Sequence, residues 1–322
     1  MLATNRREFL KKSTVVGAAL TTALATEVQA GETPGAEGKD RFKIGILFGD
    51  NPAERPPAEL APGYEVGEMP ISLQVLPFDT NAAWARKRAE FASWKNLPPI
   101  KVTSHFINPP IKFLTGPEAD DELLDLWMRR TFPRLAQVGV EAIGVYGHFW
   151  VAEAPGLSQT QARDQALTVA NRIADYAKQY KMVIALEPMG DPKTLWPLYK
   201  DGIAFAKQTG RPEIRVMADT AYFMQYNQSL EDIASAPEYL VHCQTSGAKM
   251  SNGHLGQPGV GNMVDFHTRF FTILRRIGYK GAVSCACAWV DTTGSGKMQF
   301  GVETAKTLQY LRGLRDKVYS RG

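Results

Sequence analysis

The sequence lacks the features of several large protein classes. Beyond residue 30 it has no apolar run long enough to span a bilayer. No Gly-rich dinucleotide or phosphate loop follows any of its apolar runs, and there is no internal repeat or low-complexity tract. These absences argue against a stable membrane span, a repeat protein and an open nucleotide-binding sheet.

Cysteine is scarce as well. The three cysteines are Cys243, Cys285 and Cys287, an odd number that cannot pair completely within one chain. Cys285 and Cys287 are two residues apart on one expected strand, which is a poor geometry for a disulfide between them. We therefore expect no disulfide framework, and we expect the three thiols to face outward and pack as small apolar groups.

The chain also has little excess charge of either sign. Its formal net charge is +4, and the first thirty residues contribute four basic and two acidic side chains to it. The remainder is left with a formal charge of about +2, which argues against a nucleic-acid partner.

Residues 1–30 have the pattern of an export signal. Arg6 and Arg7 precede an uncharged stretch from Ser13 to Thr26, and Val28-Gln29-Ala30 resembles a small-residue cleavage site. The paired arginines resemble a twin-arginine signal, which implies the twin-arginine translocation machinery as a partner and a periplasmic or secreted protein. The alternative is an uncleaved amphipathic anchor. Residues 31–40 are expected to form a flexible leader, and residues 41–322 one domain.

Short apolar runs alternate with amphipathic stretches through this domain. Two of these stretches, Asp120 to Val138 and Ser158 to Tyr180, have helical periodicity, and the second begins with a Ser cap. Eight runs suit strands buried on both faces of a parallel sheet: Phe42 to Phe48, Tyr64 to Pro70, Ile100 to Ile107, Val140 to Gly147, Lys181 to Pro188, Ile214 to Asp219, Tyr239 to Thr245, and Gly281 to Trp289. This repetition predicts an α/β fold, a single (β/α)8 TIM barrel.

Polar residues gather where the expected strands end, at the edge of a barrel that carries active sites. They are Glu68, His105, His148, Glu187, Asp219, His242 and Gln244, with His254 in a following loop. Each histidine alone could be a satisfied structural residue. Their common rim instead suggests substrate contacts for Glu68, His105 and His254, and proton carriers for His148, His242 and Glu187.

Glu187, Asp219 and a side chain of the seventh strand could hold one divalent ion. Two carboxylates plus an imidazole or amide oxygen favour Mn²⁺, Mg²⁺ or Co²⁺ over a structural zinc. Such an ion would polarise a carbonyl oxygen while a carboxylate removes a proton from the adjacent carbon. In the alternative interpretation, Glu187 and Asp219 form ion pairs with Arg or Lys in the barrel mouth.

Several motifs resemble those of the sugar phosphate isomerase/epimerase superfamily, which has a xylose isomerase-like barrel and includes ketose 3-epimerases and hydroxypyruvate isomerases. The motifs are Ala185-Leu186-Glu187-Pro188, Ala218-Asp219-Thr220, His242-Cys243-Gln244 and Gln257-Pro258-Gly259-Val260-Gly261. The resemblance implies that Glu187, Asp219 and Gln244 are metal ligands. It also implies that His242 lies beside them, as a neighbour of the substrate.

The chain departs from the family pattern at two places. Ala286 stands where the family usually has a glutamate on the eighth strand, and Tyr222 stands where it tends to have a histidine. Without that glutamate, epimerisation by two carboxylates on opposite faces of a carbon is in question. Asp291, His254 or Cys285 could fill the gap, and a Cys285 thiolate would favour zinc.

Aromatic residues also follow the expected strands. Trp150 and Trp289 are candidates for stacking on a sugar ring, and Tyr222 is a further candidate substrate contact. The alternative is that these rings roof the barrel.

Three functions remain open from the sequence. The first is an exported isomerase or epimerase acting on a sugar or polyol at a carbon next to a carbonyl. The second is eliminative cleavage of an oxidised glycoside, a lyase reaction that needs only one base. The third is a non-catalytic periplasmic sugar-binding protein.

Overall fold

The computed structural model describes residues 40–48, 59–71, 75–104, 110–251 and 253–320. The proposed signal (residues 1–30), most of the leader and His105 lie outside these residues. In the described part of the chain, no helix has the length and apolar character needed to cross a membrane.

Eight parallel strands close into a barrel in which each strand pairs with the next and β8 pairs with β1. The strands are β1 (Lys43–Leu47), β2 (Val66–Pro70), β3 (Ile100–Ser104), β4 (Ala142–Tyr146), β5 (Val183–Glu187), β6 (Ile214–Asp219), β7 (Leu240–Thr245) and β8 (Ala282–Cys285). Every expected apolar run contains one of them, so the predicted single (β/α)8 barrel is confirmed.

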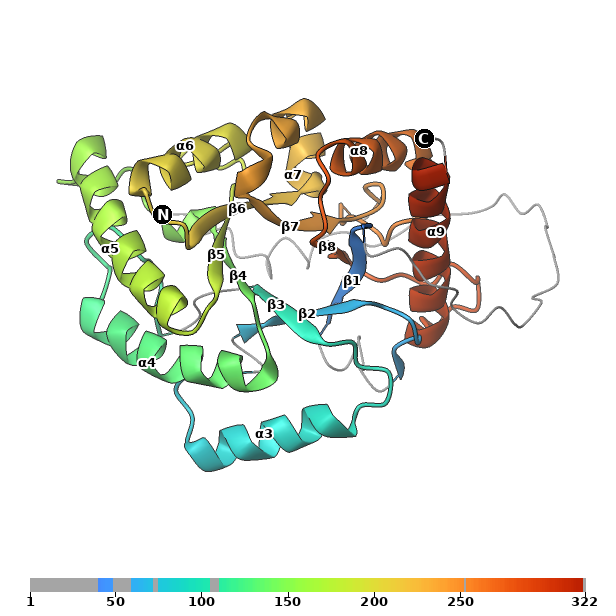
Figure 1. Cartoon of the computed structure of the whole chain (residues 1–322), viewed down its shortest axis with the longest axis horizontal. Helices are drawn as coiled ribbons and strands as arrows, with labels where there is room; N and C mark the ends of the chain where they lie inside the picture. Colours follow the sequence, from blue (N-terminus) through green and yellow to red (C-terminus); the bar gives the residue numbers. More distant parts are fainter. Residues whose placement is uncertain (1–39, 49–58, 72–74, 105–109, 252, 321–322) are drawn as a thin grey trace.

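Helices surround the barrel, with α3 lying farther from the strands than the others (Figure 1). They are α3 (Asn81–Ser93), α4 (Asp121–Val138), α5 (Gln159–Gln179), α6 (Tyr199–Thr209), α7 (Thr220–Gln225), α8 (Val264–Arg276) and α9 (Phe300–Ser320). The 3₁₀ segments are η2 (Gly147–Phe149), η3 (Leu230–Ser235) and η4 (Pro237–Tyr239).

The two expected helices form where the sequence predicts them. The side chain of Asp120 accepts a hydrogen bond from the backbone N–H of Leu123 and so begins α4. Ser158 begins α5 with a capping box completed by Gln161. Both helices bury one apolar stripe against the strands, which explains why a 3.6-residue periodicity revealed them.

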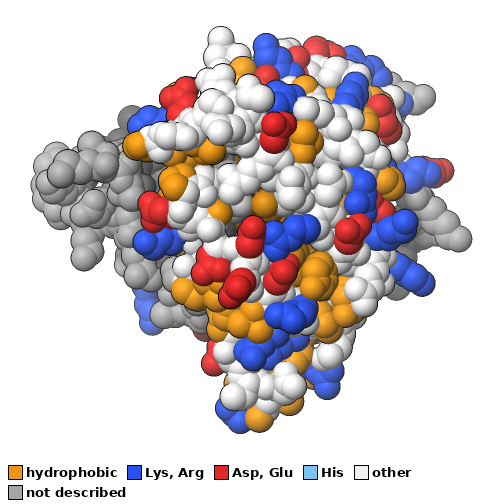
Figure 2. All heavy atoms as spheres, turned by 90° about the vertical axis from the view of Figure 1, so that its left-hand side faces the viewer, with side chains coloured by type: hydrophobic (Ala, Val, Ile, Leu, Met, Phe, Trp, Pro, Cys, Tyr) orange, Lys and Arg blue, Asp and Glu red, His pale blue; other side chains and the backbone are white. Residues whose placement is uncertain are grey.

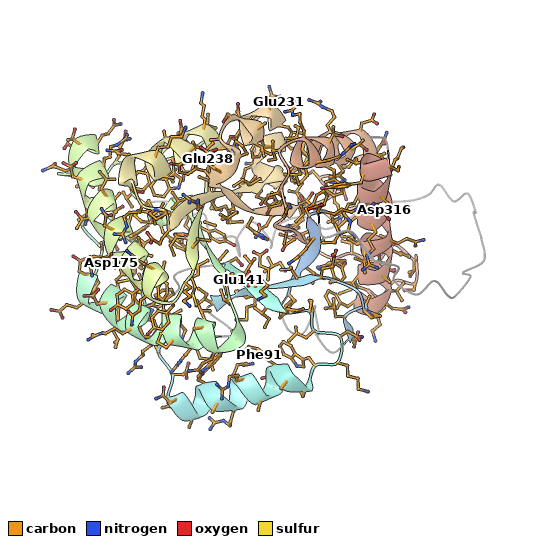
Figure 3. The ribbon with its side chains drawn as sticks, viewed as in Figure 1. Phe91, Glu141, Asp175, Glu231, Glu238 and Asp316 are labelled. Carbon is orange, nitrogen blue, oxygen red and sulfur yellow. The ribbon has the colours of Figure 1, made fainter. Side chains whose placement is uncertain are left out.

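The outside of the molecule carries charge of both signs. On the side where α5 lies, basic and acidic side chains are interspersed (Figure 2). Ion pairs join neighbouring helices there, including Arg172 with Asp121 and Asp125. Peripheral carboxylates such as Asp175, Glu231 and Asp316 lie away from the barrel interior (Figure 3).

Candidate functional site

Small residues make room inside the barrel. A Cβ on Gly144 of β4 would lie 3.1 Å from the Met217 sulfur of β6. Since β4 and β6 are not neighbours, the two residues meet in the interior. On β1, a Cβ on Gly45 would lie 2.7 Å from the Ser284 hydroxyl of β8. Gly45 therefore provides the space that the Ser284 side chain occupies.

The alternation of strand side chains places both candidate carboxylates in this interior. Asp219 is two residues after the inward-facing Met217, at the end of β6. Ala185 is the register partner of Gly144, so Glu187, two residues further along β5, faces inward too. Both side chains are buried, and Asp219 also accepts a 2.9 Å hydrogen bond from the backbone N–H of Ala221, which begins α7.

Gln244 and His242 of β7 meet Glu68 of β2 inside the barrel. The Gln244 amide nitrogen lies 2.5 Å from Glu68 Oε1, and His242 Nε2 lies 2.8 Å from Glu68 Oε2. Because β8 and β1 stand between β7 and β2 in the barrel order, these side chains can touch only across the interior. On β6, Asp219 is the register partner of Gln244. The structure thus brings Glu187, Asp219, Gln244, His242 and Glu68 into one polar interior.

The environment of Glu68 favours its ionised form. Complete burial alone would raise the pKa of this carboxyl. The charge of His242 and the hydrogen bonds from His242 and Gln244 outweigh that penalty and hold the pKa of Glu68 below its usual range. The Glu68 carboxylate therefore places a negative charge in the barrel interior, beside β2.

An apolar residue, Ala286, stands after β8 where the family usually has a glutamate. Ala286 follows β8, and its backbone N–H continues the strand ladder with a 3.0 Å bond to the Thr245 carbonyl. Ser284 faces the interior, so the intervening Cys285 faces outward, where its sulfur lies 3.4 Å from that of Cys287. All three cysteines are free thiols and are buried. Cys285 therefore does not replace the missing glutamate.

The other two candidates for the position of the missing glutamate are Asp291 and His254. Asp291 is partly exposed and accepts hydrogen bonds within its own loop, from Thr293, Ser295 and Gly296. Bonding to Thr293 is the largest influence that lowers the pKa of Asp291, to about 2. His254 is half-buried in the loop after β7, and its carbonyl accepts from the Met250 N–H.

The remaining predicted residues lie around the rim in different environments. His148 is exposed on η2, with Nδ1 3.2 Å from the Met189 sulfur and its ring against Phe149. Tyr222 is half-buried on α7, and Trp289 is half-buried against Phe300. Trp150 is only 1% exposed and packs on Trp196. That ring belongs to the packed core, and its predicted stacking role would require the loop to open.

Sequence reasoning missed two residues of this region. Ser284 lines the interior beside Glu68, and the two-residue period of β8 could have placed it there. Glu303, in the first turn of α9, accepts hydrogen bonds from Gln257 and Thr292 and thereby joins the loops that follow β7 and β8. A glutamate in a helix gives no sequence signal for such a contact.

The donors fit a divalent ion only in part. Among the residues that the structure describes, no three His, Cys, Asp or Glu side chains form a group that could hold a metal. Glu187 and Asp219 supply two carboxylates, and the Gln244 carbonyl is the remaining oxygen, because its amide nitrogen is bonded to Glu68. Two carboxylates and an amide oxygen form a hard donor set of the kind that Mg²⁺ or Mn²⁺ accepts.

Comparisons with known proteins agree with this architecture. The family model of the Xylose isomerase-like TIM barrel matches residues 61–312. The chain belongs to this family. A search of curated proteins finds no match.

Solved sugar epimerases have the same fold. A D-psicose 3-epimerase determined with D-fructose has a TM-score of 0.64 at 20% identity, covering 85% of this chain and 99% of its own. A D-allulose 3-epimerase from Methylomonas sp. has a TM-score of 0.64 at 20% identity, with 85% and 97% covered. A 3-keto-D-glucoside 4-epimerase from E. coli has a TM-score of 0.62 at 16% identity, with 85% and 100% covered.

Proposed function

We propose that this protein is an exported sugar isomerase or epimerase that moves a proton at a carbon next to a carbonyl. The observation that carries the proposal is the set of buried polar side chains at the ends of three consecutive strands: Glu187, Asp219 and Gln244. Packing alone does not explain two buried carboxylates at the catalytic edge of a barrel. The family and the sugar epimerases that share the fold support a sugar substrate.

In this proposal each polar side chain of the site has a separate role. Glu187 takes the proton from the substrate carbon, and its burial lets it act as a base away from bulk water. Asp219 and the Gln244 carbonyl, with Glu187, would hold a divalent ion. When bound, that ion would polarise the carbonyl oxygen of the substrate. His148, exposed at the rim beside Met189, is positioned to exchange protons with solvent.

A second candidate reaction is favoured by Ala286. The methyl group of Ala286 cannot act as a second base on the opposite face of the substrate carbon next to the carbonyl. Eliminative cleavage of a 3-keto glycoside needs one base to remove the proton next to the carbonyl, after which the leaving group departs. The fold shared with a 3-keto-D-glucoside 4-epimerase supports an oxidised glycoside as the substrate class.

Proton exchange with the substrate tests both reactions. The protein, loaded with Mn²⁺, is incubated in D₂O with D-psicose or with a 3-keto-glucoside, and the products are followed by NMR. An isomerase or epimerase places deuterium on the carbon next to the carbonyl and returns an isomer. A lyase releases the group attached to the neighbouring carbon. Binding of sugar without exchange would support the sugar-binding protein instead.

The variant Glu187→Gln separates the proposed base from the rest of the fold. We expect at least a 10²-fold loss of exchange, the usual scale for removing a general base. Glu141→Gln is the matched control, since Glu141 precedes β4 at the opposite rim and pairs with Lys101 (Figure 3). Equal rates in Glu187→Gln and the wild type would refute the site.

Export rests on residues 1–30 and has its own test. We propose that the twin-arginine signal directs the protein to the periplasm or outside the cell. A fusion of residues 1–40 to a folded reporter should be exported, and replacement of Arg6 and Arg7 by Lys should retain it inside. Export of the Lys variant at the wild-type rate would contradict the proposal.

A further inference from the structure

Glu68 is completely buried inside the barrel, and each of its carboxylate oxygens makes a hydrogen bond. Oε1 is bonded to the Gln244 amide and Oε2 to the His242 imidazole. We infer that Glu68 is a positioning residue that turns the Gln244 amide so that its carbonyl oxygen is presented to the site. This inference rests on the proposed function, in which that oxygen is one of three ligand atoms.

The orientation follows from hydrogen-bond chemistry. The atom of Gln244 that lies 2.5 Å from Glu68 Oε1 is its amide nitrogen, so Gln244 turns its NH₂ toward this carboxyl group. The carbonyl oxygen of the same planar amide must then point away from Glu68. Asp219 is the register partner of Gln244 on the adjacent strand and faces the same interior. Gln244 and Asp219 thus occupy paired positions on adjacent strands, and the residue that holds the Gln244 amide comes from β2 across the barrel.

The same surroundings argue against a direct substrate role for Glu68. A carboxylate with no exposed surface, held by Gln244 and His242, is not reached by a sugar hydroxyl unless its surroundings move. The same carboxylate holds the His242 ring, because His242 Nε2 lies 2.8 Å from Glu68 Oε2. Glu68 thus sets the orientation of two β7 side chains at once, as outer-shell carboxylates do around metal ligands.

The informative substitution is Glu68→Gln, which keeps the size of the side chain. A glutamine at this position can meet the Gln244 amide either as donor or as acceptor, so the orientation is no longer imposed. We expect Mn²⁺ to bind the variant about 10 to 100 times more weakly, the usual effect of losing an outer-shell partner. Glu65→Gln is the matched control. Glu65 precedes β2 and pairs with Arg315, at the other end of the barrel from the site.

A double-mutant cycle distinguishes orientation from charge. Mn²⁺ affinity is measured by calorimetry for the wild type, Glu68→Gln, Gln244→Ala and the double variant. If Glu68 acts through the Gln244 amide, Glu68→Gln should change affinity by less than about threefold once Gln244 is absent. A loss of the same size in both backgrounds would overturn the inference, because the carboxylate would then act by its charge alone.

A second measurement requires neither metal nor turnover. With ¹⁵N in the glutamine side chains, the NH₂ signal of metal-free Gln244 should be protected from exchange relative to exposed Gln179, and the protection should be lost in Glu68→Gln. An unprotected Gln244 signal in the wild type would overturn the inference, even if Glu68→Gln failed to fold. Absence of Mn²⁺ binding by the wild type with a protected Gln244 signal would refute the proposed metal site and leave the orienting role of Glu68 standing.

Discussion

Glu303 of α9 is bonded to the loops that follow β7 and β8, and its substitution tests how much these hydrogen bonds stabilise the protein. Its Oε1 accepts a 2.9 Å bond from the Thr292 N–H, and its Oε2 accepts from the Thr292 hydroxyl at 2.7 Å and the Gln257 amide at 3.0 Å. The side chain is only 1% exposed and lies in the first turn of α9, where a negative charge is favoured by the helix dipole.

The expected cost follows from these contacts. In Glu303→Ala the buried Gln257 amide loses a charged acceptor but keeps its 2.9 Å bond to the Val290 carbonyl. Water can replace the two bonds to the exposed Thr292 at little cost. One buried bond to a charged group plus two replaceable ones predict a loss of about 2 to 3 kcal/mol in the free energy of unfolding. Glu303→Gln keeps the shape but turns one donor toward another, so we expect about 1 to 2 kcal/mol.

Urea unfolding followed by tryptophan fluorescence measures this loss as a lower transition midpoint with an unchanged slope. The control is Glu238→Ala, a change at an exposed glutamate that should stay within about 0.5 kcal/mol of the wild type. A similarly small change in Glu303→Ala would refute the reasoning, since the loops would then be held without their shared carboxylate.

Three further predictions concern other parts of the molecule. Gly190→Ala should lower the free energy of unfolding, measured with urea, by about 1 to 3 kcal/mol. Gly190 has φ +75°, and a Cβ there would lie 1.8 Å from the Tyr226 ring, which would have to move. The control is Gly156→Ala, where φ is +79° and no atom lies near the added Cβ, so only the cost of the backbone conformation is measured. Thr293→Ala should raise the pKa of Asp291 from about 2, measured by ¹³C NMR, and an unchanged titration would contradict this. Because the pKa is lowered from 3.8, the stabilisation of the loop is fully present above pH 3.8 and is lost as the pH falls toward about 2. The three cysteines should resist a thiol reagent in the native protein and react fully after unfolding, and rapid native labelling would show that they are accessible.

The fold was accessible from the sequence because each element repeats a strong local signal. Buried strands in a parallel barrel are apolar on both faces, so even the weak run from Tyr64 to Pro70 contained β2. The rule that active sites lie at the carboxyl ends of strands placed Glu187, Asp219 and Gln244 on one rim. Alternation along β7 placed His242 and Gln244 on the same side, as their shared contact with Glu68 confirms.

Contacts between segments far apart in the sequence could not be predicted from local patterns. Glu68 is 174 residues from His242 and 176 from Gln244, and no local pattern says which side chains meet across a barrel. Trp150 follows β4 like a rim residue, but its loop folds back and buries the ring against Trp196. Periodicity reports which face a residue occupies, while the pairing of faces depends on the closed three-dimensional structure.

The link between Glu68 and β7 makes the site a property of the whole barrel. Glu187, Asp219 and Gln244 come from the second half of the chain, whereas Glu68, the carboxylate bonded to the Gln244 amide, comes from the first half. A fragment containing only β5 to β8 would hold the three proposed ligand side chains and still lack the Glu68 carboxylate that is bonded to one of them. Under the proposed function, divalent-ion affinity would report on the closure of the two half-barrels, and a chain split between β4 and β5 would allow their assembly to be followed.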